Sequence, residues 1–146
     1  MSDQLFMQMA KEMRMKSGDP STKVGAVIIH KSEKGGIPGG YNSFPPGVLE
    51  TEERMNNREE KYPRIVHAEM NALMDAIAIG LDVRKGTIYV TEFPCASCCG
   101  VLITSGIRRV VAQKPTEDFL SRWSTQISIS MSMLEEAGVE LTLVSR

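Results

Sequence analysis

The sequence predicts an α/β protein in which helices and strands follow one another in the order α-β-β-α-β-α-β-α-β. In several segments the apolar residues recur every three or four positions, which is the period of an amphipathic helix. Between these segments lie short runs of branched apolar residues bounded by glycine or proline, as strands usually are. A helical segment joins the last two strands, so they can run parallel, whereas a tight turn would make them antiparallel.

The first element is predicted to be a helix. Ser2 and Asp3 are favoured N-cap residues, and the apolar residues after them keep helical spacing as far as Met13. Residues 17–20 combine serine, glycine, aspartate and proline, so we expect the helix to end there.

Two strands joined by a turn are predicted next. Residues 24–29 are a short run of branched apolar residues, which predicts a strand buried on both faces of a sheet. Residues 30–36 are charged and rich in glycine, which predicts a hairpin turn. Residues 37–41 return as a second strand, and Pro38 together with two glycines places that strand at an edge of the sheet.

Residues 43–65 are predicted to be a long irregular loop, because prolines, a glycine and adjacent asparagines interrupt any period. A loop of this length in a compact domain usually has a function or is mobile. Its glutamates are balanced by arginines and a lysine, and such mixed charge is typical of a solvated surface.

The second half of the chain is predicted to alternate helices and strands. The expected elements are helix 66–79 before Gly80, strand 87–91, helix 95–104 after Pro94, strand 108–112, helix 120–134 before Gly138, and strand 139–144. No internal repeat or low-complexity tract interrupts this order. Residues 1–146 are therefore expected to form one domain.

Composition and charge restrict the classes of partner. Hydrophobic residues are 42% and charged residues 24% of the chain, as in soluble globular proteins. The formal net charge of −1 argues against a long nucleic acid as partner, because phosphate backbones are bound by basic surfaces. We find no apolar run that could span a membrane and no signal peptide, so we expect a cytoplasmic protein without a membrane partner.

Two short motifs, each at the start of a predicted helix, carry the chemistry. The first contains His67 and Glu69, and the second contains Cys95 and Cys98 after a proline. One histidine and two cysteines suit Zn²⁺, and three protein ligands leave the fourth tetrahedral position open for water. An open position is the mark of a catalytic zinc site.

Glu69 follows the histidine by two positions, which inside a helix would put the two side chains on nearly opposite faces. At a helix end the two side chains can converge, and Glu69 would then lie near the zinc water without binding the metal. A carboxyl group there can carry protons. His-x-Glu together with Pro-Cys-x-x-Cys is the signature of the zinc-dependent nucleobase deaminases.

On these motifs the chain resembles the deoxycytidylate deaminases of the cytidine-deaminase-like superfamily. The matching segments are DPSTKVGA at 19–26, GYNSFP at 40–45, KYP at 61–63, HAEMNA at 67–72, YVT at 89–91, FPCASC at 93–98 and SGI at 105–107. The zinc motifs are common to the superfamily, whereas the Gly-Tyr-Asn and Lys-Tyr-Pro segments point to dCMP. The resemblance implies a three-layer α/β/α sandwich with a five-stranded mixed sheet.

The resemblance also implies an activity and a set of contacts. The expected reaction is hydrolytic deamination of dCMP to dUMP and ammonia by a zinc-activated water, supplying dUMP for thymidylate synthesis. Asn42 would hydrogen-bond the sugar, and Ala68 would present its backbone to the pyrimidine. The nucleotide pocket would be lined by Ser21, Thr22 and Lys23.

The chain departs from the family pattern in two places. Some relatives hold a second, structural zinc with extra cysteines and histidines that this chain lacks, so one catalytic zinc per chain is expected. Many relatives carry an aromatic and basic pair near the substrate phosphate, where this chain has Gln-Lys-Pro and Lys114 is the nearest candidate. Arg58, Lys61 and Tyr62 are either further phosphate or effector contacts or solvated surface residues.

Three other functions stay open from the sequence. A tRNA adenosine deaminase shares the zinc motifs but would need a basic surface, and a free cytosine or cytidine deaminase shares them too. A zinc-binding module without catalysis would have no need of Glu69. The resemblance further implies a homo-oligomer, either a hexamer or a dimer, with dCTP and dTTP as effectors.

Overall fold

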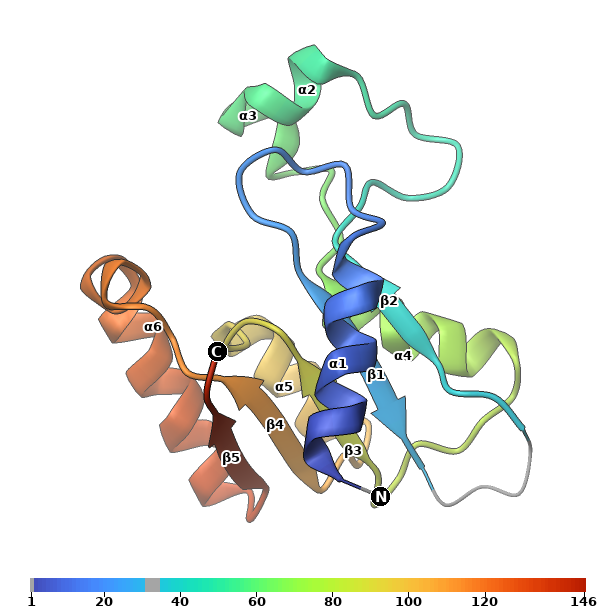
Figure 1. Ribbon diagram of the computed structural model, residues 1–146, viewed down its shortest axis with the longest axis vertical. Coiled ribbons are helices and arrows are strands. Elements are labelled where there is room, and N and C mark those ends of the chain that lie inside the picture. The colour runs from blue at the N-terminus through green and yellow to red at the C-terminus, as the bar shows by residue number, and fades with distance from the viewer. Residues whose placement is uncertain (1, 31–34) are drawn as a thin grey trace.

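The computed structural model describes residues 2–30 and 35–146, and a five-stranded sheet lies at its centre (Figure 1). Its elements in chain order are α1 Asp3–Arg14, β1 Gly25–Ile29, β2 Gly39–Tyr41, α2 Glu52–Asn56, α3 Arg58–Lys61, α4 Ala68–Ala78, β3 Thr87–Val90, α5 Ala96–Thr104, β4 Arg109–Gln113, α6 Glu117–Glu136 and β5 Glu140–Val144. The α/β class and the order of the long elements are as predicted.

The sheet is mixed, with the strand order β2-β1-β3-β4-β5. Strand β1 runs antiparallel to both β2 and β3, and β3, β4 and β5 run parallel to one another. The predicted parallel pairing of the last two strands is confirmed, because α6 carries the chain back to the end of the sheet where β4 begins. The predicted edge position of β2 is confirmed as well.

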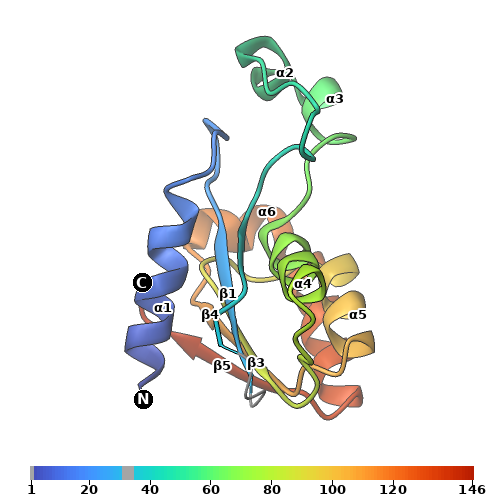
Figure 2. The ribbon, with the colours of Figure 1, turned by 90° about the vertical axis from the view of Figure 1, so that its right-hand side faces the viewer.

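Helices cover both faces of the sheet, which gives the three layers expected (Figure 2). Of the described helices, α1 covers one face, where Phe6, Met7 and Ala10 pack against Val27 and Tyr89 of the sheet. Helices α4, α5 and α6 cover the other face over the larger apolar core. The alternation of side chains along each strand sends neighbouring residues into the two cores in turn.

The helix ends follow the expected capping rules. The Ser2 Oγ accepts a hydrogen bond from the Leu5 backbone N–H at 3.2 Å, which satisfies one of the free donors at the start of α1. Gly138 has a φ of +74° immediately after α6, a left-handed conformation that glycine adopts without strain. That turn brings β5 back alongside β4.

Most element boundaries differ from the sequence prediction by one to three residues, and two of these shifts have a local reason. Strand β2 begins at Gly39 and not at residue 37, because Pro38 has no N–H for a strand ladder. Helix α4 begins at Ala68 and not at residue 66, because His67 has extended backbone angles and is the N-cap. The predicted hairpin turn at 30–36 includes residues 31–34, which lie outside the described residues.

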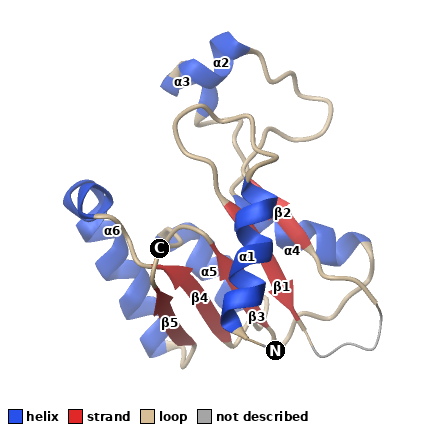
Figure 3. Cartoon of the chain, viewed as in Figure 1, coloured by secondary structure: helices blue, strands red, loops and turns tan. Residues whose placement is uncertain are grey.

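The prediction of an irregular loop over residues 43–65 is wrong in part, because the short helices α2 and α3 form within it (Figure 3). Thr51 caps α2 by accepting from the Arg54 N–H, and Asn57 caps α3 by accepting from the Glu59 N–H. Together the two helices and their linkers form an excursion, residues 43–66, that extends away from the sheet. Its two ends meet in the bridge between Ser43 and Val66.

Helix α6 is long and departs from regular geometry at one residue. Trp123 has a φ of −123° and a ψ of 17°, so the helix kinks there. Among the described residues, no helix combines the length and the apolar character that a membrane crossing requires.

Candidate active site

Backbone hydrogen bonds bring three distant segments together at the carboxyl end of β3. The Thr91 N–H donates to the Gly25 carbonyl at 3.0 Å, and the Asn42 N–H donates to the Val24 carbonyl at 3.3 Å. The bridge from Ser43 to Val66 then places the start of α4 beside the end of β2. In open α/β sheets, ligands bind at this end of the parallel strands.

Two helix N-termini converge there with reactive side chains at their caps. His67 is the N-cap of α4 and Cys95 is the N-cap of α5, and neither side chain caps its own helix. Each side chain is therefore free to point toward the other motif. The partial positive charge of a helix N-terminus favours a thiolate and any negative charge that develops nearby.

The predicted ligand set forms a compact cluster. One ligand atom each from His67, Cys95 and Cys98 lie within 4.8 Å of one another. The His67 Nδ1 is 3.3 Å from the Cys98 Sγ and 3.7 Å from the Cys95 Sγ. Ideal Zn–N and Zn–S bonds at a tetrahedral angle would separate nitrogen and sulfur by about 3.5 Å, so the cluster fits a zinc ion.

A hydrogen bond between the two cysteines moves the pKa values of their thiols in opposite directions. The hydrogen bond from Cys98 lowers the pKa of the Cys95 thiol to about 4, so this side chain is a thiolate at neutral pH. The same hydrogen bond, together with burial, raises the pKa of Cys98. Because a metal ion binds cysteine as the thiolate, its binding to both sulfurs would release the proton of the Cys98 thiol.

His67 lies at the exposed rim of the cluster, and its ring interacts with both sulfurs. The hydrogen bond with Cys95 is the largest influence on its pKa and raises it, and the nearby charge of Glu69 acts in the same direction. Because a ligating histidine must be neutral, zinc binding and proton binding compete at this ring.

Glu69 occupies the first turn of α4, and only 4% of its surface is exposed. Burial raises the pKa of its carboxyl group above the usual value, while a hydrogen bond with Cys98 and the charge of His67 act in the opposite direction. Glu69 follows the ligand candidate His67 by two residues, and its carboxyl is not among the clustered ligand atoms. A buried carboxyl with a raised pKa beside a metal site is suited to proton transfer.

Packing from neighbouring elements fixes the two motifs. The fully buried Ser130 of α6 donates its hydroxyl hydrogen bond to the Pro94 carbonyl at 2.9 Å, next to Cys95. On the other side, Gly40 of β2 lies directly against the first turns of α4, where a Cβ would come 2.5 Å from the Ala68 carbonyl oxygen. The sequence analysis did not single out Ser130, and it noted Gly40 only as the first residue of the Gly-Tyr-Asn segment.

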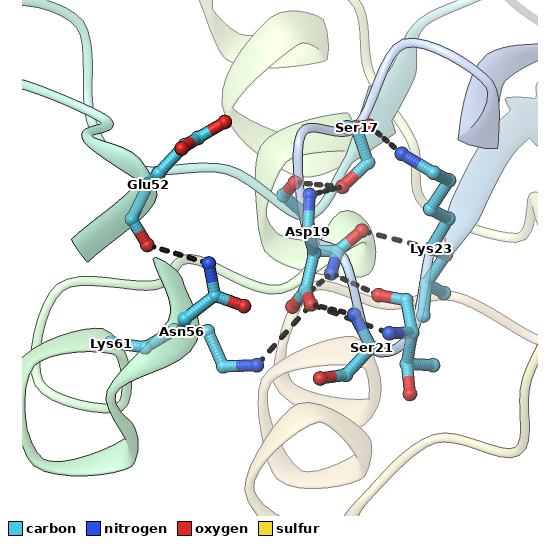
Figure 4. A network of polar contacts seen from close by, with 10 residues as sticks. Ser17, Asp19, Ser21, Lys23, Glu52, Asn56 and Lys61 are labelled. Carbon is cyan, nitrogen blue, oxygen red and sulfur yellow. Dashed lines mark hydrogen bonds and ion pairs between the residues drawn. The ribbon is translucent and has the colours of Figure 1, made fainter. Parts of the chain in front are cut away.

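Asn42 is buried, and its side chain is hydrogen-bonded to the loop that joins α1 to β1. Its Oδ1 accepts from the Val24 N–H at 2.9 Å, and its Nδ2 donates to the Thr22 carbonyl at 2.8 Å and to Asp19 Oδ2 at 3.3 Å. The Lys23 ammonium donates to the Ser17 carbonyl (Figure 4). Ser21, Thr22 and Lys23, predicted to line the pocket, are exposed in this loop.

The remaining predicted residues lie in three places. Ala68 is the first residue of α4, where backbone N–H groups have no partner within the helix. Lys114 is exposed just after β4. Arg58 lies over the ring of Tyr62 at 5.6 Å on the excursion. Lys61 is buried and forms an ion pair with Asp19 at 3.2 Å.

Comparisons with known proteins agree with this geometry. Residues 1–114 match the family described as "Cytidine and deoxycytidylate deaminase zinc-binding region". An uncharacterized deaminase of the luxG 3′ region in Aliivibrio fischeri is 42% identical, over 94% of this chain and 89% of that protein. Human deoxycytidylate deaminase is 38% identical over 73% of this chain, which spans 61% of the human protein.

The same fold is found in a solved structure of a viral enzyme. The dCMP deaminase from the cyanophage S-TIM5, crystallised in complex with dCMP and dUMP, matches with a TM-score of 0.76. The match covers 99% of each chain at 23% sequence identity. At that identity the likeness shows a common fold, with the sheet and helices in the same arrangement.

Proposed function

The chain belongs to the cytidine and deoxycytidylate deaminase family, and we propose that it hydrolyses the 4-amino group of dCMP to give dUMP and ammonia. The observation that carries this proposal is the cluster of His67, Cys95 and Cys98, with the buried Glu69 two residues after His67 in the first turn of α4. Human deoxycytidylate deaminase among the relatives and the dCMP-bound viral enzyme favour dCMP as the substrate.

One Zn²⁺ per chain would be held by His67, Cys95 and Cys98. When bound, the ion lowers the pKa of a water molecule toward neutrality. The Cys95 thiolate is a negatively charged ligand for this ion. The partial positive charge of the two helix N-termini stabilises the thiolate form of the cysteines.

Glu69 moves the protons of the reaction. Its carboxylate accepts a proton from the attacking water and delivers it to N3 of the cytosine, which makes C4 more electrophilic. After the oxygen has added to C4, Glu69 takes the remaining proton of that hydroxyl group and passes it to the amino group. The C4–N bond then breaks, the C4 carbonyl forms, and ammonia leaves. Burial raises the pKa of this carboxyl toward the working pH, which favours transfer in both directions. Backbone N–H groups at the start of α5 stabilise the negative charge that develops.

The loop before β1 and the end of β2 bind the sugar and phosphate in this proposal. Asn42 contacts the sugar, Ala68 offers its backbone to the pyrimidine, and the pocket wall consists of Ser21, Thr22 and Lys23. Lys114 is the candidate for the 5′-phosphate, since it follows β4 at the carboxyl end of the sheet. Arg58 and Tyr62, which form a cation–π contact on the excursion, are candidates for effector contact.

Further proposals concern the assembly and setting of the protein. We place the whole chain in one domain that forms a homo-oligomer in the cytoplasm, with dCTP and dTTP as effectors. Exposed apolar side chains on the outer surface of α4 and α5 support the oligomer, because such a patch is usually covered by a partner. They are Met74, Ile77 and Val101, which are 50%, 67% and 37% exposed.

A substrate panel tests the proposed reaction. Ammonia release is measured in parallel from dCMP, CMP, cytidine, dCTP and a tRNA anticodon stem with zinc-loaded protein. We expect dCMP to give the highest kcat/KM. Turnover of the tRNA stem or of cytidine above that of dCMP would assign the chain to one of the alternative functions instead. Absence of turnover on all five, with zinc bound, would favour the zinc-binding module.

A further inference from the structure

The excursion places a lysine where lysines are rarely found. Lys61, at the end of α3, is only 8% exposed, and its ammonium group is 3.2 Å from Asp19 Oδ1. Asp19 lies in the loop between α1 and β1, 42 residues earlier in the chain, and is only 4% exposed (Figure 4). A buried ammonium and a buried carboxylate each need a charged partner, since the loss of either leaves an unpaired charge away from water.

Asp19 is the acceptor around which the loop is organised. Its Oδ1 accepts from the backbone N–H groups of Ser21 at 2.9 Å and Thr22 at 3.3 Å, in addition to Lys61. Its Oδ2 accepts from the Asn42 side chain at 3.3 Å. One carboxylate thus fixes the backbone of two residues of the proposed nucleotide pocket and the side-chain orientation of a third.

Ser17 closes the network on the side away from Lys61. Its hydroxyl donates to the Asn42 carbonyl at 2.8 Å, and its Oγ accepts from the Asp19 N–H at 3.2 Å. Asn42 in turn holds the entry to β1 by accepting from the Val24 N–H at 2.9 Å. The charge of Lys61 therefore acts on the loop through an unbroken series of short polar contacts.

We propose that Lys61 is a positioning residue that holds Asp19, and through Asp19 the loop 17–24 and Asn42, in the conformation that receives the sugar and phosphate of the nucleotide. The inference rests on the proposed function for its substrate, but the positioning itself is a property of the free protein. Lys61 does not touch the substrate in this role. The excursion would then contribute to substrate binding through the buried end of α3.

The test compares two variants of the excursion, Lys61→Met and the control Arg64→Met, each of which loses one positive charge. Lys61→Met removes the charge and keeps an apolar stem of similar length. Arg64 lies in the turn after α3 and pairs with Glu60 at 3.4 Å. Within the described part of the chain the ion pair of Asp19 is with Lys61, so Arg64→Met controls for lost charge alone. Hydrogen exchange is followed by mass spectrometry at the amides of Ser21, Thr22 and Val24, without any nucleotide. The amides of α4 serve as the internal reference.

In Lys61→Met we expect exchange at the three loop amides to rise about 10-fold or more, with the α4 amides and the zinc content unchanged. In Arg64→Met the same amides should exchange as in the wild type. With dCMP as substrate, KM should rise about 10-fold or more in Lys61→Met and kcat should change less, because Glu69 and the zinc ligands are untouched.

Wild-type exchange at the loop amides in Lys61→Met would overturn the proposal, and so would an equal rise at the loop and at α4, which indicates general loosening. An unchanged KM would overturn the link to substrate. If Lys61→Met does not fold, Lys61→Gln is measured with the same readouts and decides in the same way. Should dCMP prove not to be a substrate, the proposed function fails while the exchange data still decide whether Lys61 positions the loop.

Discussion

Replacement of Gly40 by alanine tests how the fold holds the two halves of the site together. Gly40 lies on β2 against the first turns of α4, and a Cβ there would be 2.4 Å from the Ala72 nitrogen and 2.5 Å from the Ala68 oxygen. Both atoms belong to helix backbone, which cannot rotate away as a side chain can. Ordinary contact begins near 3.4 Å, so β2 and α4 must separate locally by about 1 Å.

The cost of that separation can be placed on the scale of other overpacked cores. Forced insertion of a methyl group into a packed interior lowers the free energy of unfolding by roughly 1–3 kcal/mol. Because the neighbours of Gly40 are rigid helix backbone, we expect Gly40→Ala to lie at the upper end, at about 3 kcal/mol. For a chain of this size that corresponds to a fall in Tm of about 10 °C. Because β2 leads into Asn42 and α4 carries Glu69, the same shift should lower kcat/KM for dCMP as well.

The assay is urea and thermal unfolding of the zinc-loaded protein, with Gly100→Ala as the matched control. Gly100 lies within α5, where a Cβ would meet only the Met133 Cε at 3.6 Å. The control should therefore gain stability, by about 0.8 kcal/mol, from the better helix propensity of alanine. A wild-type Tm for Gly40→Ala would refute the close packing of β2 on α4.

Two further predictions concern the metal and the dependence of stability on pH. Elemental analysis should show that Cys98→Ala reduces the zinc content from about one ion per chain to near zero. The control, Cys99→Ala, changes a buried cysteine outside the ligand cluster and should keep the zinc. Two zinc ions per chain in the wild type would indicate a second site. The Arg109 guanidinium lowers the pKa of the Asp3 carboxyl to about 2. Asp3 thus stabilises the fold at pH values above its ordinary pKa of 3.8 and loses this contribution as the pH falls toward 2. Asp3→Asn should lower the free energy of unfolding by about 1 kcal/mol at pH 7, after allowance for solvent screening of the partly exposed pair of Asp3 and Arg109. In urea titrations the deficit should shrink below pH 4, and a deficit that grows there would contradict the assignment.

Most of the sheet and the long helices could be predicted from periodicity, because each has an apolar face that repeats along the sequence. The two short helices of the excursion could not, since five and four residues are too few to show a period. Their signals were the caps, Thr51 and Asn57, each followed by glutamates. The kink at Trp123 has no sequence signal, since no proline or glycine lies in that turn.

The ligand cluster could be predicted because its chemistry is local, with Cys95 and Cys98 on one turn and His67 on another cap. The ion pair between Asp19 and Lys61 could not be predicted in the same way. Its partners are 42 residues apart, and the charged stretch around Lys61 looks like a solvated surface. Pairing of buried charges over such a distance depends on the path of the whole excursion, which the local pattern does not determine.

The central claim is that Glu69 carries protons and does not bind the metal, and Glu69→Gln tests it most directly. Glutamine keeps the size and the hydrogen bonds of the side chain but cannot accept the proton. Zinc content by elemental analysis and dCMP affinity by calorimetry should stay close to those of the wild type. The rate of dCMP deamination should fall by at least roughly 10²–10⁴-fold, as for loss of a general acid–base group. Loss of zinc from this variant, or deamination of dCMP at the wild-type rate with zinc retained, would contradict the account.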